Sequence, residues 1–236
     1  HLMSDGKVKV ATETAASITS TTFEDSTYDA AACYDTANDK LVVIWSDGGN
    51  DYKGMGAVGT VDSNGDITFG TAVEFRSTET RRIDCCFEPG RGVVAIIYSN
   101  YDNNDQPAMI LGKVSGTSIS FHGNDNMNNE PSSSNAITAG PANKVLIQYR
   151  DGNYAHRLNV QTIAANGESF TNGNTKNIDG KSRYFAAAWS PTLERFCVTY
   201  SDQADSNKLK AQLLNDEGTS QTGTNASAIE VNSTSG

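Results

Sequence analysis

The sequence predicts an all-β fold, and within that class a β-propeller built from four-stranded blades. An apolar stretch that ends in an aromatic residue recurs four times in the 236 residues, at Trp45, Tyr98, Tyr149 and Tyr200. These aromatics lie 53, 51 and 51 residues apart. Each repeat offers four short strand segments separated by Gly, Asn and Asp turns. Four strands at a period near 50 residues are typical of a propeller blade.

The first repeat defines the pattern, and we name its four strands a, b, c and d. They are expected at 28–34, 40–46, 53–61 and 66–75. The turn between c and d contains Asn64-Gly65, which favours a two-residue hairpin because both residues adopt positive φ angles at low cost. Strand a is rich in small residues, as expected where blades converge at the propeller axis. The large aromatics of strand b are then expected to pack between blades.

The later repeats follow the same order. Strands are expected at 82–87, 93–99, 108–114 and 118–122 in the second, and at 134–138, 144–149, 157–163 and 168–170 in the third. In the fourth they are expected at 184–189, 195–200 and 208–214, with a last strand ending near Val231. The register is supported by aligned Phe69, Phe121 and Phe170 in strand d.

All the repeats are assigned to one propeller domain. Residues 1–3 resemble a cloning scar, and 4–26 are expected to form a half blade with strands c and d. Full blades are placed at 27–77, 78–130, 131–180 and 181–236. This count favours a five-bladed ring with one incomplete or shared blade. Two alternatives stay open for ring closure: further repeats in a longer chain, or two chains that complete each other. A β-sandwich and a β-solenoid are the competing architectures.

The amino-acid composition limits which classes of partner the protein is expected to bind. The chain has 28 acidic and 18 basic residues, a net charge of −10. Such a surface repels phosphate backbones and anionic membranes, so nucleic acid and membrane insertion are not expected. No apolar run has the length of a membrane-spanning helix. The four cysteines form no C-x-x-C pattern, and buried free thiols are expected.

One alternative function is a glycoside hydrolase. That chemistry needs two carboxyl groups on opposite sides of the scissile bond, and the inner strands of a propeller can supply them to a central pocket. Asp29 and Asp84 lie in strand a of the first two repeats. Asp35 and Glu88 share one repeat position after that strand, which indicates a turn role instead. The third and fourth repeats offer no acid in strand a, so the set is incomplete.

The loops between strands b and c are rich in oxygen ligands, at 47–51, 101–105 and 202–205. Calcium favours such clusters, but no loop matches an EF-hand pattern. Neither calcium nor another cofactor is therefore expected, and these segments are interpreted as surface turns.

The same b–c loops contain aromatic residues beside Asp, Asn and Gly. Such an aromatic ring can stack on the apolar face of a sugar while carboxylates and amides bond its hydroxyl groups. Repetition around a ring would add weak sites through avidity. The candidate ligand-binding residues are Asp51, Tyr52, Tyr101, Asp102 and Tyr154. The alternative is that these tyrosines only cover hydrophobic edges.

Two segments carry a family resemblance. Residues 114–121 (VSGTSISF) and 61–69 (VDSNGDITF) resemble repeat units of β-propeller arrays in phage tail or virion proteins and bacterial surface proteins. That resemblance implies an extracellular, cell-surface or virion location. In length and blade count alone the chain is also similar to five-bladed lectins of the tachylectin-2 type, whose repeat motif is absent.

Together these features favour a non-catalytic recognition or assembly module that binds a glycan or another surface ligand through its blade loops. The incomplete blade also predicts a homo-oligomer. The alternatives are the glycoside hydrolase and a purely structural repeat module, virion-associated or engineered.

Overall fold

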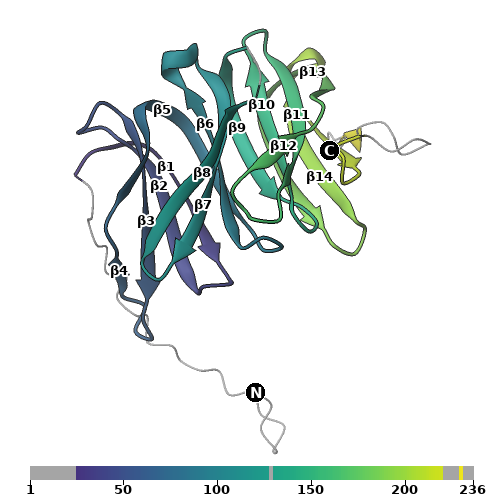
Figure 1. The fold of residues 1–236 in the computed structure, drawn as a ribbon. Helices are drawn as coiled ribbons and strands as arrows, with labels where there is room; N and C mark the ends of the chain where they lie inside the picture. The colour runs from purple at the N-terminus through teal and green to yellow at the C-terminus, as the bar shows by residue number, and fades with distance from the viewer. Residues whose placement is uncertain (1–24, 128–129, 220–228, 231–236) are drawn as a thin grey trace, which may run out of the picture.

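The computed structural model describes residues 25–127, 130–219 and 229–230, and these form an all-β propeller fold of four-stranded antiparallel blades (Figure 1). Strand a of successive blades is β1 (Thr27–Asp35), the second half of β5 (Val73–Glu88), β9 (Ser132–Ala139) and the second half of β13 (Lys176–Ser190). Strand b is β2 (Lys40–Asp47), β6 (Val93–Asn100), β10 (Lys144–Asp151) and β14 (Arg195–Asp202).

Strands c and d complete each blade. Strand c is β3 (Lys53–Val61), β7 (Gln106–Ser115), β11 (Ala155–Ile163) and β15 (Lys208–Leu214). Strand d is β4 (Ile67–Phe69) with the start of β5, β8 (Ser118–Asn126), β12 (Phe170–Asn172) with the start of β13, and β16 (Ile229–Glu230). Two short 3-10 turns, η1 (Tyr101–Asn103) and η2 (Gln203–Asp205), lie in b–c loops.

The predicted propeller class is confirmed, and the described residues contain four blades side by side (Figure 1). The five-bladed count stays a prediction. The half blade expected at 4–26 lies almost wholly outside the described residues.

Two strands are longer than the sequence predicts. The expected break between strand d of one blade and strand a of the next is absent in β5 and in β13, so the boundaries placed at 77/78 and 180/181 fall inside these strands. β5 pairs with β3 through its first half and with β6 through its second half. No Gly or Pro interrupts it, so the chain changes sheet through register shifts and a left-handed residue, Arg82 (φ 52°).

The hydrophobic core is divided among the boundaries between blades. Tyr98 faces the first blade and packs with Val42 and Ile44, while Tyr149 and Tyr200 occupy the next two boundaries in the same way. All three rings are at most 3% exposed, which confirms the expected packing role of the repeated aromatic. Burying side chains of this size contributes about 1.5–3 kcal/mol each.

Close packing also depends on a small residue in strand c. Gly56 lies beside Phe121, and a Cβ at this position would be 2.8 Å from the Phe121 ring. The first and second blades can therefore approach only because Gly56 has no side chain.

The turns between strands a and b use the two acids that the sequence assigned to them. The Asp35 carboxylate accepts the N–H groups of Ala37 and Asn38, at 2.9 and 3.0 Å. Glu88 accepts those of Gly90 and Arg91, both at 2.8 Å. The predicted turn role of Asp35 and Glu88 is confirmed.

The four cysteines are free thiols. The Cys85 thiol lies in hydrogen-bonding contact with Cys33 of the neighbouring blade, and this contact and burial raise its pKa. Among the described residues, no helical segment has the length and apolar character needed to cross a membrane.

Candidate functional site

The b–c loops lie at one end of the blades, along the upper edge of Figure 1. Each begins with Asp or Asn at the end of strand b. The Asp47 carboxylate accepts the N–H of Gly49 at 2.9 Å, and Asp151 and Asp202 each accept the N–H two residues further on at the same distance. Short Asx turns of this kind fix the start of a loop.

The last loop residue has a left-handed backbone in every blade. These residues have φ angles between 56° and 69°, and they are Tyr52, Asp105, Tyr154 and Asn207. In the first two blades the carbonyl of this residue accepts the N–H of a hydroxyl residue in the next strand a, from Thr80 to Tyr52 at 2.9 Å and from Ser132 to Asp105 at 2.8 Å. In these two blades the last loop residue is therefore bonded to the neighbouring blade, while the start of the loop is fixed by its own turn.

One exposed cluster forms at the boundary between the first and second blades. We call it the Tyr–Arg cluster; its members are Tyr28, Tyr52, Arg81 and Tyr101. The Tyr28 and Tyr52 rings meet edge to face, with centroids 5.5 Å apart. The Arg81 guanidinium lies 4.1 Å from the Tyr101 ring centroid and 5.7 Å from that of Tyr28.

Arg81 is held in this position by an ion pair. Its Nε donates to Glu79 Oε1 at 2.6 Å, and a second guanidinium nitrogen lies 2.5 Å from the same oxygen. The three tyrosine rings nevertheless keep 39–59% of their surface exposed. The cluster therefore presents fixed aromatic surface next to hydrogen-bonding groups.

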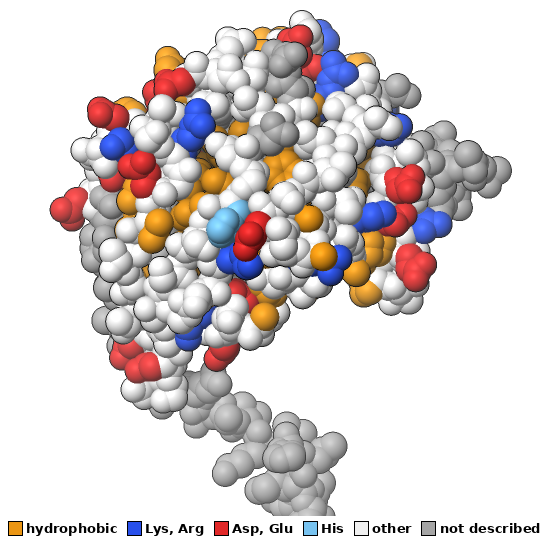
Figure 2. Space-filling view, in the orientation of Figure 1, with side chains coloured by type: hydrophobic (Ala, Val, Ile, Leu, Met, Phe, Trp, Pro, Cys, Tyr) orange, Lys and Arg blue, Asp and Glu red, His pale blue; other side chains and the backbone are white. Residues whose placement is uncertain are grey.

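A second group lies at the boundary between the third and fourth blades. The Arg150 guanidinium is 4.2 Å from the Tyr154 ring centroid, and the Lys181 ammonium is 5.8 Å from it. Tyr154 is 50% exposed. Figure 2 shows Lys and Arg side chains among acidic ones along the same upper edge of the molecule.

The structure brings only some of the predicted ligand-binding residues together. Tyr52 and Tyr101 join one cluster through Tyr28 and Arg81, whereas Tyr154 belongs to the second group. Asp51 and Asp102 are exposed in their loops, and neither contacts an aromatic ring in the interactions described above.

Sequence reasoning missed Tyr28, Arg81, Arg150 and Lys181. A usable signal existed for the first two, because Tyr28 and Arg81 lie 53 residues apart and so share one place in the repeat. Arg150 occupies the place of Ser46 and Ser99 in the other blades, so its significance depends on three-dimensional contact.

Two carboxylates at the start of the b–c loops form ion pairs within their own blades. Asp151 is fully buried and pairs with Arg157 at 2.6 Å, and Asp202 pairs with Lys210 at 2.7 Å. Within the described part of the chain, no group of three or more His, Cys, Asp or Glu side chains is arranged to hold a metal ion.

Asp29 and Asp84, the candidate catalytic acids, both connect inner strands. Asp29 Oδ2 accepts the N–H groups of Arg82 and Ile83 in the second blade. Asp84 Oδ2 accepts the N–H of Ile137 in the third blade at 2.9 Å. Burial raises the pKa of Asp84, although its two backbone hydrogen bonds act in the opposite direction. Both carboxylates thus link strand a of one blade to strand a of the next.

Comparisons with known proteins support the fold. No protein-family model matches the chain, and a search of curated proteins finds no match. Among solved structures the chain is similar to the Hadza microbial sialidase Hz136, with 11% identity and a TM-score of 0.55 over 86% of this chain and 45% of that one. It is also similar to a protein of unknown function from Dyadobacter fermentans, with 10% identity and a TM-score of 0.58 over 89% and 65% of the two chains.

A third similar structure is Sqt1 from Chaetomium thermophilum, solved bound to the N-terminus of the ribosomal protein L10. The identity is 13% and the TM-score 0.55, over 85% of this chain and 50% of that one. The chain therefore spans roughly half to two thirds of the length of these neighbours. The shared feature is the β-propeller fold, which in these neighbours occurs in an enzyme and in a binding protein.

Proposed function

We propose that the protein is a non-catalytic recognition module that binds carbohydrate through its b–c loop face. The observation behind this proposal is the Tyr–Arg cluster, in which the fold gathers three exposed tyrosines and one arginine from separate segments of two blades. Partly exposed tyrosines at fixed angles offer apolar surface to a sugar ring, and Arg81 and Glu79 offer hydrogen bonds to its hydroxyl groups.

The rigidity of the loops also favours recognition. Tyr52 has a left-handed backbone, and its carbonyl is bonded by Thr80 of the next blade. Less conformational freedom is then lost when a ligand binds. The Tyr154 group offers a second contact on the same face, and two weak sites on one extended glycan bind more tightly than either alone.

The roles of Asp29 and Asp84 support binding over hydrolysis. A hydrolase needs one carboxyl group to protonate the leaving oxygen and a second to act as nucleophile or base. Here both accept backbone N–H groups from the neighbouring inner strand, which orients them toward strand packing.

A glycan array followed by calorimetry tests the proposal. The wild-type protein should bind at least one glycan, and Tyr52→Ala and Tyr101→Ala should each weaken binding by about tenfold or more, because each removes an aromatic contact. Tyr34→Ala is the matched control, since Tyr34 is 44% exposed but lies at the opposite end of strand a. Equal weakening in all three variants, or no binding to any glycan, would contradict the proposal.

A further inference from the structure

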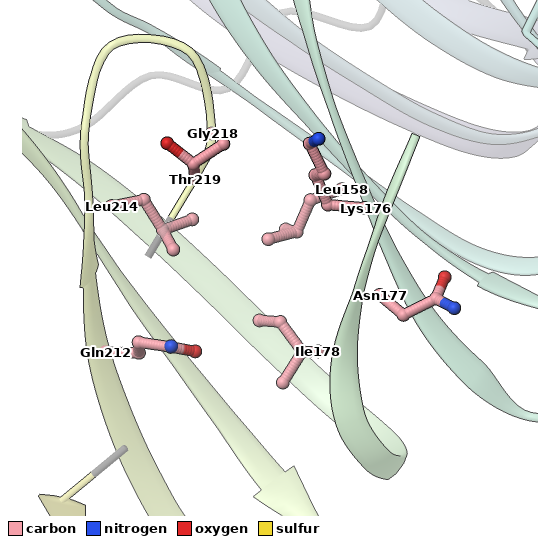
Figure 3. Close-up of a pocket in the computed structure, with 8 residues that line it drawn as sticks. All are labelled: Leu158, Lys176, Asn177, Ile178, Gln212, Leu214, Gly218 and Thr219. Atoms are coloured by element: carbon pink, nitrogen blue, oxygen red, sulfur yellow. The ribbon is translucent and has the colours of Figure 1, made fainter. Parts of the chain in front are cut away.

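The boundary between the third and fourth blades is hollowed along its length, from the outer strands to the a–b turns. Two adjoining hollows of about 170 and 240 Å³ share Lys176 and Thr219. In the first, Leu158 and Ile178 face Leu214 and Gln212 across the hollow, below the turn that contains Gly218 (Figure 3). The larger of the two continues through Asp216 into a third pocket of about 490 Å³. We call this third pocket the Trp189 pocket.

Of these three hollows in the described part of the chain, the Trp189 pocket has the volume of a small-molecule site, which is usually about 300–1,000 Å³. It lies at the end of the blades opposite the b–c loops, between the a–b turns of the third and fourth blades and the turn after β15. Its lining residues are Pro141, Trp189, Pro191, Glu194, Arg195 and Asp216.

The aromatic wall of this pocket is held in place by packing. The Trp189 and Phe196 rings meet edge to face with centroids 4.8 Å apart. Phe196 is fully buried and lies against the turn after β9, where a Cβ on Gly140 would be 2.4 Å from the ring. Trp189 keeps part of its surface accessible, so its indole forms a fixed wall of the pocket.

The polar groups of the pocket balance in charge. Arg195 and Glu194 lie next to each other, and Asp216 pairs with Lys144 of the third blade at 2.7 Å. Arg195 and Glu194 line the pocket as one cation and one anion, and the charge of Asp216 is balanced by Lys144 just outside it. This balance favours an uncharged ligand with many hydroxyl groups, because a carboxylate can accept from a hydroxyl and a cation can donate to one. An indole wall adds an apolar platform for a sugar ring.

We infer that the Trp189 pocket is a binding site for a short neutral oligosaccharide, separate from the b–c loop face. The equivalent position in the second blade carries Val93, so a charged residue at the place of Arg195 is not required by the repeat itself. The inference does not depend on the proposed function, because the two sites lie at opposite ends of the blades and share no residue.

Trp189 is also the natural reporter for the test. The chain has two tryptophans, and Trp45 is only 1% exposed. In a Trp45→Phe background, the fluorescence of Trp189 should change saturably when neutral gluco-, manno- or galacto-oligosaccharides are added. Bound sugar should also protect Trp189 from acrylamide quenching. Calorimetry on the wild-type chain with the same sugars repeats the measurement without the Trp45 substitution.

Three variants distinguish this site from the b–c loop face. Arg195→Ala and Glu194→Gln should each weaken sugar binding by about tenfold or more, as expected when a hydrogen bond to a charged group is lost. Lys40→Ala, at the place of Arg195 in the first blade, should leave binding unchanged. The inference is overturned if no neutral sugar gives a saturable change, if a peptide binds instead, or if Arg195→Ala and Glu194→Gln bind like the wild type.

Discussion

Replacing Asp84 by Ala should destabilise the protein, whereas replacing it by Asn should leave stability nearly unchanged. Asp84 Oδ2 accepts the N–H of Ile137 and Oδ1 accepts the N–H of Cys85, both at 2.9 Å. Asn retains one acceptor oxygen for the Ile137 N–H and loses the acceptor for the Cys85 N–H, but it also removes a charge that is unfavourable when partly buried. Ala retains no acceptor and leaves the N–H of Ile137 without its partner between the second and third blades.

The magnitude follows from these hydrogen bonds. Leaving a buried donor unpaired costs about 1–3 kcal/mol, so Asp84→Ala should lower the free energy of unfolding by about that amount. For a chain of this size each kcal/mol shifts Tm by about 2–4 °C. Asp84→Asn should stay within about 0.5 kcal/mol of the wild type, or stabilise the protein slightly.

The pH dependence gives a second readout. Burial raises the pKa of Asp84 above its ordinary value of 3.8, so the folded protein holds this proton more tightly than the unfolded chain. The resulting stabilisation is complete below pH 3.8 and is lost as pH rises through the folded-state pKa. Asp84→Asn should abolish this dependence.

Urea and thermal unfolding of both variants at pH 7, and of Asp84→Asn across pH 3–7, provide the test. If Asp84→Asn destabilises the protein as strongly as Asp84→Ala, the negative charge itself is required. The role assigned to Asp84, as a hydrogen-bond acceptor between two blades whose charge is not needed, would then be wrong.

Two further predictions concern the boundaries between blades. Burial lowers the pKa of His156 to about 3, so the unfolded chain binds a proton at this residue that the folded protein excludes. The free energy of unfolding should therefore fall as pH drops from about 6.5 toward 3, by at most about 1.4 kcal/mol per pH unit. Denaturation of His156→Phe at several pH values should show a flatter profile, and an unchanged slope would refute this. Tyr98→Phe should lower the free energy of unfolding by about 1 kcal/mol through loss of the 2.7 Å hydrogen bond to Asn124. Tyr98→Ala should lower it by about 3–5 kcal/mol because it leaves a cavity. Equal urea midpoints for the two variants would contradict the packing role of Tyr98.

The repeat pattern predicted most of the fold because each strand buries its side chains against a neighbouring blade in the same way. Strand c of the first blade was placed at the residues it occupies, Lys53–Val61. The continuity of β5 was not predicted, because a break between strands d and a was expected at 77/78, whereas β5 runs unbroken from Val73 to Glu88. The transfer from one sheet to the next depends on register shifts and on Arg82, which are visible only in three dimensions.

The candidate site was predicted less completely. Tyr52 and Tyr101 could be found from composition, since aromatics in polar loops are conspicuous. The contacts that join them through Tyr28 and Arg81 could not be predicted, because these contacts depend on how two blades are placed side by side. The Trp189 pocket had no sequence signal either, since its walls come from three turns in two blades.

We propose that the Tyr–Arg cluster is the carbohydrate-binding surface of the b–c loop face. Its most direct test is a titration of the tyrosine ring NMR signals with the glycan that binds most tightly on the array. The signals of Tyr28, Tyr52 and Tyr101 should shift together with one dissociation constant, while that of Tyr34 stays in place. Shifts confined to other tyrosines, or none at saturating ligand, would contradict the claim.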